Sequence, residues 1–149
     1  MKSLYDQGAY NDILSRLNKL DANSKGEWGK MSVAQMFAHT SCPVRVALAD
    51  KPAPRMLMGR LMGWMMKSQL YNDKPWGKNL PTATDFKITN ERNFDEEKRT
   101  LLSLLDEFHK QGPIKAGRFA HPFFGKFTNE QWGKSIYKHM DHHLTQFGV

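Results

Sequence analysis

Cysteine is nearly absent from this sequence, because Cys42 is the only one among 149 residues. A single cysteine cannot form a disulfide within the chain, so we expect a reducing location, the cytoplasm. Long apolar runs are also missing. The most apolar stretch, Met56 to Met66, is interrupted by Arg60 and is far shorter than the roughly 20 residues that cross a bilayer. The first residues are polar and show no signal peptide. We therefore expect a cytoplasmic protein with no membrane contact.

Acidic residues are in the minority, with 15 Asp and Glu against 22 Lys and Arg, which gives a formal net charge of +7. An excess of this size raises the question of nucleic-acid binding. However, the basic residues are spread along the whole chain, and there is neither a zinc-finger spacing nor an aromatic RNA-binding signature. We interpret the charge as a solvated basic surface and expect no specific nucleic-acid partner.

The sequence also lacks the alternation of apolar and polar residues that indicates β-strands. Apolar residues instead recur with helical spacing in five segments, near residues 4–20, 32–50, 55–70, 94–111 and 128–147. Ser32 with Gln35, and Thr128 with Gln131, have the spacing of a capping box, which marks a helix start. The pattern predicts one all-α domain over residues 1–149. Its simplest architecture is a four-helix bundle with an extra short helix and two long connections.

The extra helix, residues 55–70, carries a stripe of large apolar residues, namely Met58, Leu61, Met62, Met65 and Met66. Because methionine fills irregular gaps in cores, we interpret the stripe as core packing. A membrane-surface or partner-binding helix is the alternative. The connection over residues 71–90 has no helical period, and a loop of this length in a small domain is often functional. The second connection, residues 113–127, is rich in phenylalanine.

Three of the six histidines lie close together near the end of the chain, at His139, His142 and His143. At about 100° per residue, His139 and His143 fall on one apolar face of the last helix, whereas His142 falls on a polar face. Side chains four residues apart can meet at one ion. Without a metal, and with no carboxylate nearby, both core histidines would have to remain neutral and find hydrogen-bond partners in an apolar setting. We interpret them as a metal-binding pair, with hydrogen-bonded core histidines as the alternative.

A third ligand is needed, because catalytic zinc usually has three protein ligands. His39 is the best candidate. It lies on a core-facing edge of the second helix, where Pro43 cannot donate a hydrogen bond to the His39 carbonyl and a kink is therefore expected. Cys42 is close enough in sequence to be a ligand, but a buried, inert thiol is the favoured interpretation. His109, near a helix end, is explained by the helix dipole.

Three segments, "WGKMSVAQMFAH", "HPFFGKFTNEQW" and "YKHMDHHLTQFG", together resemble the DinB-like superfamily of metal-binding four-helix bundles, in particular a branch whose function is not established. The similarity runs from about Trp28 to the end of the chain, although the middle helix and the long loop contribute little to it. The resemblance implies a divalent metal held by one histidine from an early helix and two from the last helix. In this sequence these are His39, His139 and His143. Homodimers are common in the superfamily, so the resemblance allows one here.

Some members of the superfamily are metal-dependent transferases or isomerases that use low-molecular-weight thiols. The resemblance therefore implies an enzyme acting on a small-molecule substrate, of this kind or a hydrolase, with a metal-bound water or thiolate as the reactive group. Zinc or nickel is the expected metal, with iron or manganese as alternatives. A non-catalytic metal-binding bundle is one rival hypothesis. An interaction module that uses the basic surface or the methionine-rich helix is another.

Three further residues are candidates for the surroundings of the metal. His121 lies in the loop before the last helix and is a candidate catalytic residue, a partner that holds a metal ligand in place, a substrate contact or only an anchor for the loop. Trp76 and the phenylalanine-rich connection are expected to form pocket walls. Gln146 follows His143 on the edge of the apolar face, where it could orient a ligand or a bound water.

Overall fold

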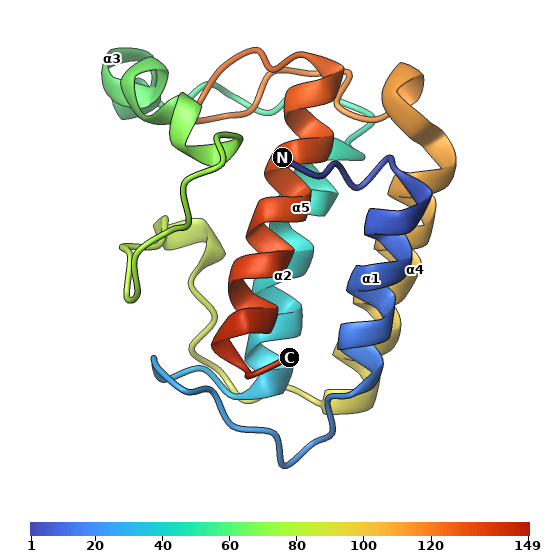
Figure 1. The fold of residues 1–149 in the computed structure, drawn as a ribbon. Coiled ribbons are helices and arrows are strands. Elements are labelled where there is room, and N and C mark those ends of the chain that lie inside the picture. Colours follow the sequence, from blue (N-terminus) through green and yellow to red (C-terminus); the bar gives the residue numbers. More distant parts are fainter.

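The computed structural model describes residues 1–149 and contains five α-helices, two short 3₁₀ helices and no strand (Figure 1). The elements are α1 (Gln7–Asn18), α2 (Val33–Ala47), α3 (Leu57–Met66), η1 (Lys67–Leu70), η2 (Thr84–Phe86), α4 (Phe94–Lys115) and α5 (Asn129–Gln146). The expectation of an all-helical chain is confirmed, and each predicted segment coincides with one of the five α-helices, although α4 extends beyond its predicted end. No helix is both long enough and apolar enough to cross a membrane.

Four helices, α1, α2, α4 and α5, lie side by side, while α3 stands apart at one end of the molecule (Figure 1). Helix α2 packs against both α4 and α5, and α5 also packs against α1. The fully buried core between them includes Leu17, Phe37, Leu105, Phe108, Trp132, Ile136, Met140 and Leu144. The packing of α2 against α5 brings residues about 100 positions apart in the sequence into contact.

Both predicted capping boxes form. The Ser32 hydroxyl accepts a hydrogen bond from the Gln35 N–H at 3.2 Å, and the Gln35 side chain accepts one from the Ser32 N–H at 3.0 Å. Thr128 and Gln131 make the equivalent pair of bonds at the start of α5. These bonds satisfy N–H groups that have no partner inside the helix. They fix where the two histidine-bearing helices begin.

Two helices contain a proline, and one of them also contains a glycine that bends it. Helix α2 runs through Pro43 to Ala47 as one element. In α4 the helix does not end near residue 111 as predicted but is kinked at Gly112. Gly112 has φ +62°, a left-handed conformation that glycine adopts readily, and the chain then resumes helical geometry as far as Lys115.

The expectation that the α3 stripe packs in the core is wrong. Its five members are exposed, from 42% for Met66 to 63% for Leu61. The buried face of α3 consists of Gly59 and Gly63, which lie against the backbone of Phe123. Periodicity shows that one face of a helix is apolar, but it does not show which face the rest of the protein covers. Here two glycines allow the backbone of α3 to approach a loop closely, and the large side chains point away.

Replacing Gly59 by alanine should loosen α3. A β-carbon at this position would lie 2.3 Å from the carbonyl oxygen of Phe123, a backbone atom. Overpacking of this kind costs about 1–3 kcal/mol, which hydrogen exchange of the α3 amides would report as a lower free energy of opening. Gly8→Ala is the matched control, because Gly8 lies in α1 with open space around it. Unchanged hydrogen exchange of the α3 amides in Gly59→Ala would contradict the close approach of α3 to the Phe123 backbone.

Candidate metal centre

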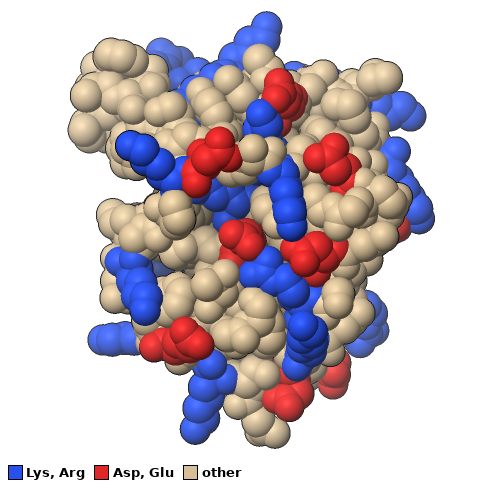
Figure 2. Space-filling model, viewed as in Figure 1, with Lys and Arg blue, Asp and Glu red and all other residues tan.

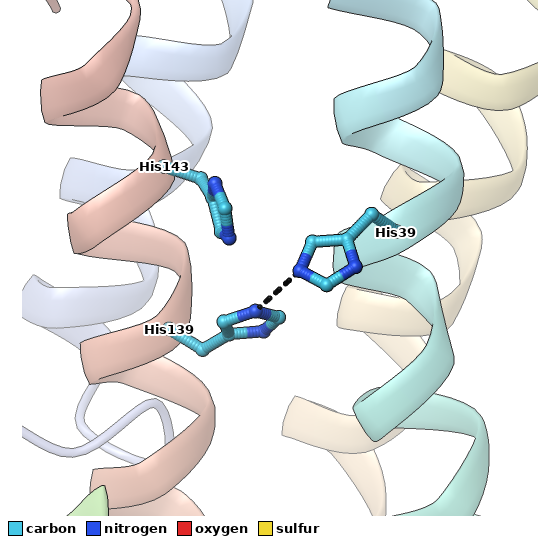
Figure 3. Close-up of side chains that lie close together, drawn as sticks. All are labelled: His39, His139 and His143. Atoms are coloured by element: carbon cyan, nitrogen blue, oxygen red, sulfur yellow. Dashed lines mark hydrogen bonds between the residues drawn. The ribbon is translucent and has the colours of Figure 1, made fainter. Parts of the chain in front are cut away.

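Three histidines converge at the interface between α2 and α5. His39 projects from α2, and His139 and His143 project from α5 towards it (Figure 3). One nitrogen atom of each imidazole lies within 4.8 Å of those of the other two. The Nε2 atoms of His39 and His139 are 3.0 Å apart. The structure thus brings together the three residues that the sequence singled out.

The ring of His39 is oriented by a backbone carbonyl. Its Nδ1 donates a hydrogen bond to the carbonyl oxygen of Phe86 at 2.9 Å, so the proton is on Nδ1 and the lone pair is on Nε2. The 3.0 Å contact with His139 therefore has the Nε2–H of His139 as its donor. Phe86 ends η2, inside the long connection for which the sequence showed no structure. Sequence reasoning missed this contact because every residue has a carbonyl and nothing marks one of them.

The ring of His143 is oriented by Gln146. Nδ1 of His143 donates to the Oε1 atom of Gln146 at 2.8 Å, and Nε2 of Gln146 donates to the carbonyl oxygen of Trp28 at 2.7 Å. The second bond holds the amide so that its oxygen faces His143. Consequently the Nε2 lone pair of His143 is directed away from Gln146, towards the other two histidines (Figure 3). Gln146 does lie beside His143, but its amide is engaged with these two partners.

The three imidazoles are held in the neutral form. Burial lowers the pKa of His143 to about 3, with a further contribution from His39. Burial, followed by the neighbouring His143 and His39, places the pKa of His139 well below its usual value. Burial also lowers the pKa of His39, although its hydrogen bond to Phe86 opposes the shift. The cluster contains no carboxylate. Three uncharged nitrogen donors therefore face one another at neutral pH.

Trp76 covers the α5 histidines from the outside. Its ring lies 5.7 Å from that of His139 and 5.4 Å from that of His142. The ring of His142 also lies 6.0 Å from that of Trp28. The predicted polar face of His142 is thus covered by two tryptophans from loops distant in the sequence. His142 is not one of the three clustered histidines.

The loop that carries Trp76 is fastened to α5 by Lys138. The ammonium group of Lys138 is buried and donates to the carbonyl oxygens of Gln69 and Asn72 at 2.7 and 2.9 Å, and to the side-chain oxygen of Asn72 at 2.7 Å. Three acceptors satisfy the three donors of a lysine. The indole N–H of Trp76 donates to Gln69 as well. These contacts fix the wall beside His139.

The structure does not bring His121 or Cys42 to the cluster. The Nδ1 atom of His121 accepts hydrogen bonds from the N–H groups of Phe123 and Phe124 at 3.1 and 3.3 Å, and its ring packs among aromatic rings that include Trp132. Of the alternatives for His121, the loop anchor agrees with these contacts. The Cys42 thiol is half-buried and donates to the Ala38 carbonyl within its own helix.

His121 should make the fold sensitive to acid. Burial, followed by the charge of Arg55, lowers the pKa of His121 to about 4, from 6.5 in an unfolded chain. Neutral His121 therefore stabilises the fold fully above pH 6.5, and this contribution is lost as the pH falls towards 4. Between pH 7 and roughly 4.5 the loss is about 2–3 kcal/mol.

The measurement compares the free energies of unfolding of wild type and His121→Asn at the two pH values. The asparagine oxygen can accept the same N–H groups but does not titrate. Wild type should lose about 2–3 kcal/mol more than the variant on acidification, while the other histidines titrate equally in both proteins. An equal loss of unfolding free energy in the two proteins would show that protonation of His121 does not destabilise the fold.

The two best-defined surface cavities are not lined by a histidine. One, of about 210 Å³, lies between the end of α2 and the phenylalanine-rich connection and is lined in part by Arg45 and Phe119. The other, of about 510 Å³, lies at the start of α2 and is lined in part by Gln35 and Arg92. The histidine cluster is therefore a feature of the helix interface, separate from these two cavities.

The fold and the cluster define an all-helical protein in which two packed helices present three facing, neutral imidazoles. The sequence belongs to a family known as DUF1569, described as proteins of unknown function, whose model matches residues 4–148. The match spans all five α-helices and includes all three clustered histidines. Comparisons with curated proteins and with solved structures gave no match.

Proposed function

We propose that His39, His139 and His143 bind one divalent transition-metal ion. The observation that carries the proposal is the orientation of the rings. Histidine ligands of metals usually donate their second ring nitrogen to a carbonyl or carboxylate, which fixes the tautomer and aims the other nitrogen at the ion. His39 and His143 each donate Nδ1 to a carbonyl-type oxygen. Purely structural core histidines would not need one nitrogen of each of the three rings to lie within 4.8 Å of those of the other two.

The donor set favours zinc or nickel, with iron or manganese as alternatives. Imidazole nitrogens suit zinc, nickel, copper and iron, whereas magnesium and calcium prefer oxygen ligands, and the cluster has no carboxylate. His139 is the ligand that must adjust. Its Nε2–H now donates to His39 at 3.0 Å, so a metal at this point requires the proton of His139 to lie on Nδ1.

We further propose that the protein is a metal-dependent enzyme of the DinB-like type, acting on a small molecule. The side-by-side arrangement of α1, α2, α4 and α5 supports a four-helix bundle of that kind (Figure 1). When bound by three neutral imidazoles, a divalent ion keeps its full charge and can polarise the oxygen or sulfur of a water or thiol co-reactant. Hydrolysis and thiol-dependent transfer or isomerisation are the reaction classes that this chemistry suits.

The residues around the cluster have supporting roles in this proposal. Phe86 and Gln146 hold two rings in position, and Trp76 excludes water from one side of His139. Lys138 keeps Trp76 in place through the loop that it binds. No general acid or base is assigned, because His121 anchors a loop outside the cluster.

A non-catalytic metal-binding protein is the second candidate, and one observation favours it. Neither of the two best-defined surface cavities is lined by a histidine, whereas an enzyme needs space for a substrate beside its metal. A closed site of this kind would retain a metal without performing chemistry on it.

Metal analysis followed by activity panels tests the proposal. Purified wild type should carry about one equivalent of divalent metal, and His39→Ala should carry far less. The metal-loaded protein is then assayed with panels of thiol-conjugation and hydrolysis substrates. Activity that depends on the metal and is lost in His39→Ala supports the enzyme. Stoichiometric metal without activity supports the second candidate, and equal metal contents in the two proteins would refute the site itself.

Gln146 should tune the metal affinity without being a ligand. In Gln146→Leu the Nδ1–H of His143 loses its acceptor, so the ring is free to turn and is a weaker base. Changes to such supporting partners typically cost about 10–100-fold in metal affinity. A competition titration with a chelating dye measures the change. Gln131→Leu is the matched control, because Gln131 caps the start of the same helix far from His143. Equal affinities of Gln146→Leu and wild type would exclude the orienting role.

A further inference from the structure

The exposed face of α3 is the most unusual part of the surface. Eight of the ten large apolar side chains that are exposed belong to this helix or its N-cap, and they range from 40% to 73% exposed. We call them the α3 surface: Met56, Leu57, Met58, Leu61, Met62, Trp64, Met65 and Met66. Single exposed apolar residues are ordinary, but a contiguous patch of this extent marks an interaction site.

The α3 surface is convex and firmly attached. In Figure 2 it forms the uncharged projection at the upper left, at the position of α3 in Figure 1. Its base is held to the phenylalanine-rich connection by hydrogen bonds from the Met56 N–H and from the Arg55 guanidinium to the Pro122 carbonyl, both at 3.1 Å. At the other end Lys67 donates to the Lys126 carbonyl. The helix is therefore presented outward on a fixed base.

The charged residues on α3 and in its nearest flanks have one sign, and the nearest acidic residues in the sequence are Asp50 and Asp73. Residues 51–72 contain Lys51, Arg55, Arg60 and Lys67 but no aspartate or glutamate, and the whole chain carries +7. A twofold interface pairs a patch with itself, so a second copy would bring these cations together. An anionic surface would instead be complementary to them. Apolar side chains on a short helix with basic flanks are the features of helices that lie in a membrane interface.

We propose that α3 inserts its apolar side chains into the surface of membranes that contain anionic phospholipids. The helix lies in the plane of the interface, with Leu61, Trp64 and Met65 among the acyl chains and Arg60 near the headgroups. Attachment combines burial of apolar area with attraction between Lys or Arg and anionic lipid, and it is peripheral and reversible. The membrane-binding surface is separate from the histidine cluster, and the proposed attachment does not depend on a metal. It also differs from the expectation of no membrane contact, which rested on the lack of a membrane-spanning run and on packing of the α3 stripe in the core.

Flotation of the full-length protein with lipid vesicles tests the proposal. Wild type should float with vesicles of phosphatidylcholine mixed with phosphatidylglycerol, and much less with phosphatidylcholine alone. High salt should release it, because the attraction between charges is screened. His143→Ala should float as well as wild type, which separates this result from the fate of the proposed metal site.

Substitutions identify the surface that binds. Leu61→Gln and Trp64→Gln should each lower the vesicle partition coefficient about tenfold, and Arg60→Gln should lower it about fivefold on anionic vesicles only. The matched controls are Ile114→Gln, an apolar side chain 90% exposed on α4, and Arg99→Gln, also exposed on α4; both should bind like wild type. Because all these side chains are exposed, the variants should fold, as circular dichroism would verify.

Two results would overturn the proposal. The first is no flotation of wild type with anionic vesicles at low salt, together with a dimer in analytical ultracentrifugation that Leu61→Gln dissociates, since a second copy then covers α3. The second is flotation that Ile114→Gln and Arg99→Gln reduce as much as the α3 substitutions do, since the binding is then an unspecific effect of a basic protein.

Discussion

Zinc affinity should fall by more than about 100-fold when His143 is replaced by alanine, because the loss of a ligand exceeds the roughly 10–100-fold effect of losing a supporting partner. His39→Ala and His139→Ala should have effects of the same order. Each substitution removes one of the three nitrogen atoms that lie within 4.8 Å of one another. Two remaining imidazoles leave the ion with too few protein ligands for a stable site. A competition titration against a chelating dye measures all three constants under one set of conditions.

His142→Ala is the matched control for this prediction. His142 is adjacent to His143 on the same helix, but its ring packs against Trp28 and Trp76 and does not belong to the cluster. Its replacement should change zinc affinity only slightly. If His142→Ala and His143→Ala weakened binding equally, the ion would not distinguish the clustered histidine from its neighbour, and the site proposed here would be wrong.

Saturating zinc should raise the stability of the wild-type fold by about 4 kcal/mol when the free metal is 1,000 times its dissociation constant. For a domain of this size the gain corresponds to roughly 10 °C in the melting temperature. The physical reason is that the three ligands meet only in the folded chain. His39 lies on α2 and the other two on α5, about 100 residues later in the sequence. An ion that joins them binds the native state and has little affinity for the unfolded chain.

Thermal unfolding with zinc, and with zinc followed by a chelator, measures the effect. The chelator should return the melting temperature to its starting value. In His39→Ala the zinc-induced increase should nearly vanish. The two remaining histidines are close in sequence, so the unfolded chain can bind zinc through them about as well as the folded chain can. His142→Ala should keep the increase. A similar increase in wild type and His39→Ala would show that zinc stabilises the protein at another location.

Local patterns in the sequence predicted much of this structure, because their physical causes are local. A side-chain oxygen and an N–H three residues away lie within one helical turn, so the capping boxes at Ser32 and Thr128 could be recognised in advance. The shared face of His139 and His143 follows from helical geometry alone. His39 joined them through its place on the core-facing side of another helix and through the resemblance to a known superfamily.

Contacts made by loops could not be predicted in this way. The carbonyl of Phe86 that orients His39 belongs to a segment without a period, and one backbone oxygen is identical to any other. The ring of His142 was expected on a polar face, but Trp28 and Trp76 cover that face from two different loops. Such contacts depend on the path of the chain between helices, for which neither periodicity nor capping carries information.

The sequence by itself therefore determined the helical class, the starts of α2 and α5, and the pair of histidines on one face of the last helix. Only the tertiary structure decided which atoms orient those histidines, that Lys138 fastens the wall beside them, and that the apolar stripe of α3 points outward. The physical reason is the range of the interactions. Helix formation and capping act over a few residues, whereas the covering of a face depends on packing between segments far apart in the chain.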